Sequence, residues 1–321
     1  MRTTTARRTH RTRTLVALLV TALTAALATA CTGGGDRPSV VVTTNILGDV
    51  TREIVGDEAE VSVLMQPGAD PHSFGLSAVQ AAELEHADLV VFNGLGLEEN
   101  VLRHVDAARE AGVTTFGVGE AVDPMTFRAP DDGGPGDGAG QPDPHFWTDP
   151  DRVRDAAALI ARQVIEHVDG VDAAAIRANA ERYARQLTDL TAWMETSFAR
   201  IPEDRRALVT NHHVFGYLAD RFGFRVIGAV VPSGTTLASP SSSDLRSLTE
   251  AMREAGVRTV FADSSRPARL AEVLRNELGG GVRVIALHSE SLTAPGGGAD
   301  TYLRMMRTNT TVMADGLTAA R

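Results

Sequence analysis

The sequence contains no lysine and a single cysteine, Cys31, and aromatic residues make up only 5% of it. With one cysteine no disulfide can form within the chain, so stability must come from packing and from any bound ligand. Because every basic residue other than histidine is an arginine, we attribute the absence of lysine to genomic base composition and draw no functional conclusion from it. Few aromatic residues and no exposed apolar stripe give no direct support for an adhesive protein-binding surface.

Motifs of several enzyme and nucleotide-binding classes are also missing. No His-Glu-x-x-His helix is present, which disfavours a secreted zinc hydrolase. No Gly-x-Gly-x-x-Gly or Walker segment follows an expected strand, which disfavours nucleotide binding. Acidic residues number 41 against 31 basic ones, so we expect no nucleic-acid partner.

The first thirty residues have the layout of a secretory signal. Five arginines and no acid in residues 1–13 precede an apolar stretch at 15–27, which is too short for a stable membrane-spanning helix. Cys31 follows Ala28-Thr29-Ala30, at the position where bacterial lipoprotein signals place the acylated residue; a plain cleaved signal is the alternative. We predict a signal peptide at 1–30 and a lipid-anchored tether at 31–37, which would hold the exported protein on the outer face of the cytoplasmic membrane.

From Pro38 onward, short β-branched segments alternate with longer amphipathic ones, which is typical of βα units with a largely parallel sheet. A segment rich in glycine, proline and aspartate, 129–144, interrupts this alternation and is expected to form a mobile loop. Strands are expected at 40–43, 61–64, 89–92, 114–118, 207–210, 226–231, 257–261 and 282–287, and helices at 150–167, 172–199 and 302–316.

The long helix near the middle of the chain predicts how the domains are organised. It contains no glycine and is long enough to act as a spine between two lobes. The predicted fold is therefore α/β, with two βα lobes of mainly parallel sheet at 38–168 and 202–321, joined by a rigid backbone helix within 169–201. Ligands of such folds bind in the crevice beyond the carboxyl ends of the strands, where loops from both halves meet.

Two of the nine histidines occur in the same tripeptide, Asp-Pro-His. His72 lies in the loop after an expected strand, and His145 lies before the expected helix at 150–167. The prolines stiffen the backbone and so preorganise each imidazole. The repetition favours a shared role as ligands over two separate turn-capping histidines.

A third candidate ligand lies in the second half of the chain. His212 and His213 follow the strand at 207–210, and we expect them to open a helix over 214–221 that is capped by Asn211. A helix N-terminus disfavours the charged imidazolium, and neutral imidazole is the form that binds metals. One of the two rings should face the crevice and the other should point away.

Carboxylates follow two of the strands in the second lobe. Glu290 follows the strand at 282–287, and Asp263 is the competing carboxylate after 257–261. Three imidazoles and one carboxylate form a closed tetrahedral set suited to zinc, which leaves no position for a substrate and predicts binding without catalysis. His288 is a minor candidate for a supporting role. The remaining histidines are expected to be structural or to be removed with the leader: His10, His86, His104 and His167.

Together these segments resemble the zinc and manganese solute-binding lipoproteins of bacterial ABC importers, a family that includes proteins named as adhesins. The resemblance covers nearly the whole chain after the leader. It rests on Gly68-Ala-Asp-Pro-His72-Ser-Phe74, Leu89-Val-Val-Phe-Asn93-Gly94, Asp143-Pro-His145-Phe-Trp147-Thr-Asp149-Pro150, Thr210-Asn-His212-His-Val-Phe215-Gly-Tyr217, Phe261-Ala-Asp263 and Tyr302-Leu-Arg-Met-Met306.

The resemblance implies a metal site formed by His72, His145, His212 and Glu290, although the family generally has an aspartate at the last position. It implies two lobes on a rigid helix, without a large hinge closure. Manganese-preferring members tend to have a carboxylate as the third ligand, so His212 favours zinc. The chain departs from the family at Asp263, where glutamate is commoner, and at 129–144, which lacks the histidines that some zinc members carry there.

We therefore expect an exported, monomeric zinc-binding protein that delivers its metal to the permease of an ABC importer, with a metallochaperone as a candidate source of the metal. A manganese-binding protein of the same family is the main alternative. A surface adhesin and a secreted zinc hydrolase are the alternatives from other classes.

Overall fold

The computed structural model describes residues 37–127, 140–265 and 282–319. The expected signal peptide, Cys31 and most of the 129–144 loop lie outside the described residues. From Pro38 onward the chain forms one compact unit. None of the described helices is long and apolar enough to cross a membrane.

The first sheet has four parallel strands in the order β2-β1-β3-β4. Its two central strands, β1 and β3, consist almost wholly of buried apolar residues, as expected when helices cover both faces. Alternate residues of β1 point to opposite faces: Val40 and Val42 pack with α2, whereas Val41 packs with α3 and α4. The elements are β1 (Ser39–Val42), α2 (Asn45–Val55), β2 (Glu60–Val63), α3 (Ala78–Glu85), β3 (Leu89–Phe92), α4 (Glu99–Glu110), β4 (Thr114–Gly117) and η1 (Gly119–Ala121).

The second sheet repeats this strand order as β6-β5-β7-β8, again with all strands parallel. Leu208 and Phe261 face the core shared with α7 and α10, and Val209 and Val260 pack against α8 on the other face. The elements are η3 (Glu203–Arg205), β5 (Ala207–Thr210), α7 (Gly216–Phe222), β6 (Arg225–Ala229), α8 (Ser242–Glu254), β7 (Thr259–Asp263), β8 (Arg283–Leu287) and α10 (Tyr302–Thr318).

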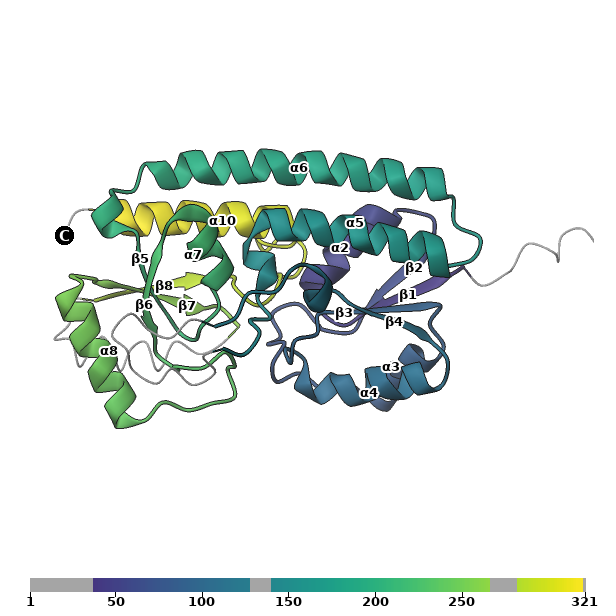
Figure 1. The fold of residues 1–321 in the computed structure, drawn as a ribbon, viewed down its shortest axis with the longest axis horizontal. Coiled ribbons are helices and arrows are strands. Elements are labelled where there is room, and N and C mark those ends of the chain that lie inside the picture. Colours follow the sequence, from purple (N-terminus) through teal and green to yellow (C-terminus); the bar gives the residue numbers. More distant parts are fainter. Residues whose placement is uncertain (1–36, 128–139, 266–281, 320–321) are drawn as a thin grey trace, which may run out of the picture. The chain divides into compact units, whose positions relative to one another are not determined.

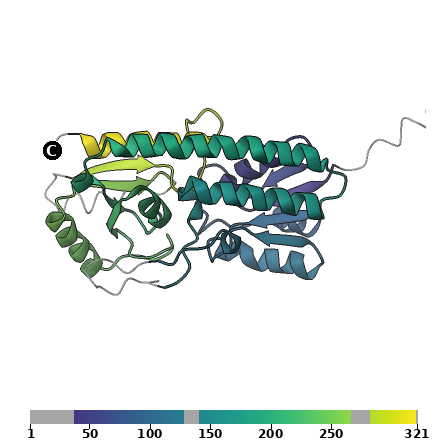
Figure 2. The ribbon, with the colours of Figure 1, turned by 45° about the horizontal axis from the view of Figure 1, so that its top comes forward.

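A long helix connects the two sheets, as the sequence predicts. After η2 (Phe146–Thr148), α5 (Pro150–His167) leads into α6 (Ala173–Ala199), which spans 27 residues and begins at an N-cap formed by Asp172. Helix α6 runs alongside α5, α2 and α10 (Figures 1 and 2). One hydrophobic cluster contains residues from both sheets and from α6, such as Val40, Leu187 and Leu208. The two lobes therefore share a continuous core.

The observed strands and helices begin and end within about two residues of the expected ones. The cap of one helix differs. Helix α7 begins at Gly216, two residues after the expected start, with Phe215 at its N-cap and no side-chain cap, so the expected cap by Asn211 is wrong.

Two buried tyrosines at the helical layer provide a matched test of this core. Tyr183 of α6 has no hydrogen-bond partner for its hydroxyl among the described residues, whereas the hydroxyl of Tyr302 donates to the carbonyl oxygen of Trp147 at 2.8 Å. An unpaired buried hydroxyl costs free energy, so Tyr183→Phe should raise the free energy of unfolding by about 1 kcal/mol. Tyr302→Phe should lower it by a similar amount, because it leaves a buried carbonyl unpaired. Urea denaturation of the metal-free protein measures both, and equal effects of the two changes would show that the two hydroxyls do not differ in their hydrogen bonding.

Candidate metal centre

Four side chains from four separate segments converge in the interior of the protein: His72, His145, His212 and Glu290. One ligand atom from each lies within 4.8 Å of the others. Glu290 Oε1 is 3.1 Å from His212 Nε2 and 3.7 Å from His145 Nε2, and its Oε2 is 3.7 Å from His72 Nε2. The structure thus brings together the four residues that were named from the sequence.

These spacings fit a single bound cation. An ion about 2.0–2.1 Å from four tetrahedral ligand atoms holds those atoms about 3.3 Å apart, and the 3.4 Å between the Nε2 atoms of His72 and His145 is close to that value. The three imidazole rings surround one point, with centroids 5.3 to 5.4 Å apart. All four residues are at most 2% exposed, so a cation held here would be shielded from water.

The two Asp-Pro-His segments share a local geometry that was not foreseen from the sequence. In each, the aspartate accepts a hydrogen bond at 3.0 Å from the backbone N–H of the histidine two residues later, Asp70 for His72 and Asp143 for His145. Asp143 Oδ1 also lies 2.7 Å from His145 Nδ1. A proton on Nδ1 shared with this carboxylate leaves Nε2 free to bind a metal, which fixes the tautomer that a ligand requires.

His212 reaches the centre without a helix N-terminus beside it. The residues between β5 and α7 form an irregular turn, in which Thr210 donates its hydroxyl hydrogen to the carbonyl oxygen of His212 at 2.6 Å. The expected contribution of the helix dipole is therefore wrong for this residue. As predicted, only one of the two rings joins the centre. His213 lies outside the cluster, and burial, with His212 next, lowers the pKa of His213 to about 4.

The loop that carries Glu290 is held by residues of the first lobe. Asn45, at the start of α2, donates from its amide to Ser291 Oγ at 2.7 Å and accepts from Leu292 N at 3.0 Å. The indole N–H of Trp147 donates to the carbonyl oxygen of Ser289 at 2.9 Å. Asn45 was not identified from the sequence; its place directly after a strand end was the available signal.

Asp263, the competing carboxylate, supports this loop and does not join the cluster. Its Oδ2 accepts hydrogen bonds from the backbone N–H and the hydroxyl of Ser289, and its Oδ1 accepts from Ser265. His288 binds Ser264 through Nδ1 at 2.9 Å and lies outside the cluster. The other histidines within the described residues lie on helices α3 to α5 or at their ends, also outside the cluster, as expected: His86, His104 and His167.

The surroundings of Glu290 disfavour the ionised form of its carboxylate. Leu47, Leu97 and Trp147 line a gap beside it that is too small to admit water. No described residue donates a hydrogen bond to either carboxylate oxygen. Burial raises the pKa of Glu290 to about 8, against an opposing effect of His145 and with additional raising by Asp263. A divalent cation would supply the missing positive charge, so the site suits a metal better than it suits an ionised carboxylate alone.

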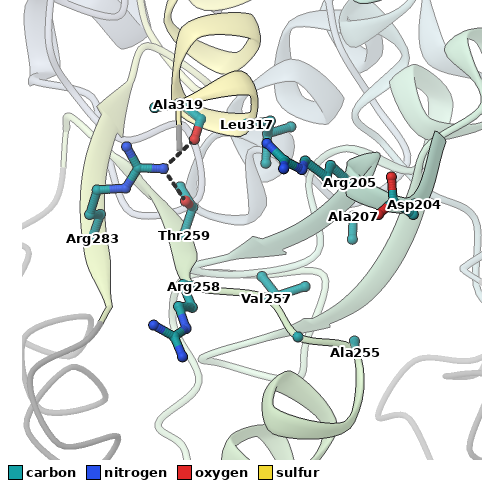
Figure 3. A pocket seen from close by; sticks show the side chains of 12 residues that line it. Asp204, Arg205, Ala207, Ala255, Val257, Arg258, Thr259, Arg283, Leu317 and Ala319 are labelled. Atoms are coloured by element: carbon teal, nitrogen blue, oxygen red, sulfur yellow. Dashed lines mark hydrogen bonds between the residues drawn. The ribbon is translucent and has the colours of Figure 1, made fainter. Parts of the chain in front are cut away.

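A separate hollow lies at the amino ends of the strands of the second sheet, opposite the strand ends that carry the clustered residues (Figure 3). It is lined by the first residues of three strands and contains Arg205, Arg258 and Arg283. Arg283 donates to the carbonyl oxygen of Gly316 at 2.5 Å, and Arg205 to that of Thr318 at 3.3 Å. Two of its arginines thus satisfy the carbonyl groups at the end of α10, which is a structural role.

The raised pKa of Glu290 predicts how the stability of the metal-free protein depends on pH. Between about pH 4.5 and pH 8 the folded protein keeps a proton that the unfolded chain releases, so the free energy of unfolding should fall as pH rises through this window. At about 1.4 kcal/mol per pKa unit, we expect a loss on the order of 5 kcal/mol from this group. Denaturation in the presence of a chelator, at several pH values, compares the wild type with Glu290→Gln, which should lack this component. Parallel profiles for the two proteins would show that Glu290 does not titrate in this window.

The chain matches the model of a known family over residues 40–316, described as zinc-uptake complex component A, periplasmic (ZnuA). This match covers both lobes and all four clustered residues. The manganese-binding lipoprotein MntA of Halalkalibacterium halodurans is 26% identical over 94% of this chain and 96% of its own length. The iron-binding protein YfeA of Yersinia pestis is 28% identical over 86% of this chain and 85% of its own length.

Solved structures show the same architecture. The periplasmic zinc-binding protein TroA of Treponema pallidum superimposes with a TM-score of 0.79 and 25% identity, over 88% of this chain and 100% of that one. Its similarity extends to the two parallel-sheet lobes and the long helix. With the family model spanning both lobes, the conclusion is that this chain belongs to the ZnuA family of metal-binding substrate-binding lipoproteins of ABC transporters.

Proposed function

We propose that this protein captures Zn²⁺ outside the cytoplasm and delivers it to the permease of an ABC importer. The observation that carries the proposal is the buried cluster of three imidazole nitrogens and one carboxylate. Four protein ligands complete a tetrahedral zinc site and leave no position at which a substrate or an activated water could bind. The metal is therefore cargo, and this donor set supports binding rather than hydrolysis.

The identity of the third ligand supports zinc over manganese. Manganese sites favour carboxylate and water oxygens, whereas imidazole nitrogen suits zinc. His212 gives the site three nitrogen ligands where a carboxylate at the same position would give two. The names of the relatives refer to manganese, iron and zinc, so manganese is the competing cargo to be tested.

The proposal includes export of the protein and its attachment to the membrane through residues 1–37. We infer a signal peptide at 1–30, acylation of Cys31 and a tether at 31–37, since several relatives are named as lipoproteins. The folded part divides into lobes at 38–168 and 202–321, joined by 169–201. It acts as a monomer on the outer face of the cytoplasmic membrane, and a metallochaperone is a candidate source of its metal.

Thermal unfolding of residues 32–321 with zinc or manganese tests the cargo and the ligand set together. A ligand present at 100 times its Kd stabilises the folded state by about 2.7 kcal/mol, so zinc should raise the Tm by several degrees. His212→Ala should lose most of this gain, because it removes one of four ligands. Manganese at the same concentration should raise the Tm less.

His167→Ala is the matched control, since His167 is exposed at the end of α5 and should leave the zinc effect unchanged. Full stabilisation of His212→Ala by zinc would overturn the ligand assignment. A larger effect of manganese, confirmed by metal analysis of the purified protein, would keep the binding function but change the cargo.

The anchor has its own test in cells that express the full chain. Cys31→Ser removes the only thiol that could be acylated, so the protein should move from the membrane fraction to the soluble extracytoplasmic fraction. Labelling with a fatty-acid analogue should mark the wild type and not the variant. Equal membrane retention of both proteins would show that the anchor is not at Cys31.

A further inference from the structure

The four clustered ligands are closed off from solvent, which raises the question of how a cation reaches them. Each is at most 2% exposed, and Phe127 and Trp147 stand beside the His145 ring, with centroids 6.2 and 5.2 Å away. On the side of Glu290, apolar packing leaves a gap too small for water. A route for the metal therefore has to be sought on another side of the cluster.

A cavity of about 360 Å³ lies next to the cluster on the side of β6 and α7. A water molecule occupies about 30 Å³ in the liquid, so this volume can hold a cation together with several of its waters. The wall contains both apolar and polar residues, and its charged residues include Asp220 and Arg225. Polar side chains on it include Asp143, which binds the ligand His145, and His213, which directly follows the ligand His212.

Asp143 connects the cavity to the metal centre through its two carboxylate oxygens. Oδ1 holds the backbone N–H and the ring of His145. Oδ2 lies close to Gly216, which also lines the cavity; a Cβ added there would be only 2.7 Å from this oxygen. No described residue donates a hydrogen bond to Oδ2, although the side chain is only 3% exposed. Asp143 therefore links the wall of the cavity to the ring of His145.

His213 contributes a second potential ligand to the same space. Its backbone N–H is bound to the carbonyl oxygen of Ser233 at 3.0 Å, which fixes the backbone at this residue, while its ring lines the cavity. An imidazole and a carboxylate are both ligands for a zinc-like ion, and two ligands bind it more weakly than the four in the centre. Such a pair can replace waters of hydration one step before the final site.

We propose that His213 and Asp143 Oδ2 form a transit site for the divalent cation, through which it enters and leaves the buried centre by way of this cavity. The inference rests on the proposed function, since it concerns the same cargo. A transit site lowers the barrier between the solution and the centre without changing either end state. Removing it therefore slows binding and release by the same factor and leaves the Kd unchanged.

Stopped-flow measurement of zinc association with the metal-free protein, and of its release to a fluorescent chelator, tests the proposal. His213→Gln removes the metal ligand but keeps a polar side chain of similar reach. We expect both rate constants to fall by roughly tenfold, with an unchanged Kd. His213→Asp restores a ligand atom and should recover most of the rate. His167→Gln, the same change at an exposed position, should match the wild type.

Three other results of these measurements would contradict the transit site or the proposed function. Unchanged rates in His213→Gln, or equal rates in His213→Gln and His213→Asp, would overturn the transit site. A raised Kd with an unchanged association rate would also overturn it, because His213 would then only support His212. If the wild type itself fails to bind zinc, the proposed function fails, and this result is visible before any variant is compared.

Discussion

The structure depends on keeping a buried carboxylate, Glu290, next to three imidazole rings. Without a cation this arrangement is costly, because the carboxylate receives no hydrogen bond from the described residues and burial raises its pKa to about 8. The surrounding protein must hold the ligands in place against that cost. A metal ion removes the cost, so the same feature that destabilises the metal-free site provides affinity for the metal.

Two kinds of interaction hold the ligands. The shared hydrophobic core, with α6 along both lobes, fixes the two sheets as one body. Hydrogen bonds across the lobes then fix the loops: Asn45 binds the Glu290 loop, and the hydroxyl of Tyr217 donates to the carbonyl oxygen of Asp143 at 2.9 Å. Arg221 of α7 pairs with Asp149 at the start of α5, at 3.0 Å. Such a frame favours binding by small loop adjustments over closure of two hinged domains.

The repeated strand order places these loops. In both sheets the first strand lies between the second and the third, so the carboxyl ends of the strands form a crevice at the point where the order reverses. His72, His212 and Glu290 all follow carboxyl ends of strands, whereas His145 is brought in by the segment before α5. If the four clustered residues hold a metal as cargo, the buried centre also requires a route, for which we propose the cavity beside Asp143 and His213.

The fold class and most element bounds could be predicted from the sequence, because β-branched runs and a long helix without glycine are local information. The sequence also offered three histidines and two carboxylates as candidate ligands, and the family resemblance favoured Glu290 as the fourth member of the set. The predicted cap of α7 was wrong, because neither Asn211 nor another side chain caps it and the segment before it forms an irregular turn around His212.

The groups that support the four clustered residues could not be read from the sequence and are set by the packing. Asn45 is separated from Ser291 by 246 residues, and no local pattern could have paired them. The same holds for Asp263, which competed with Glu290 in the sequence but anchors its loop in the structure. The choice between two carboxylates at neighbouring strand ends depends on where each side chain points and what it meets, and those are properties of the packed structure.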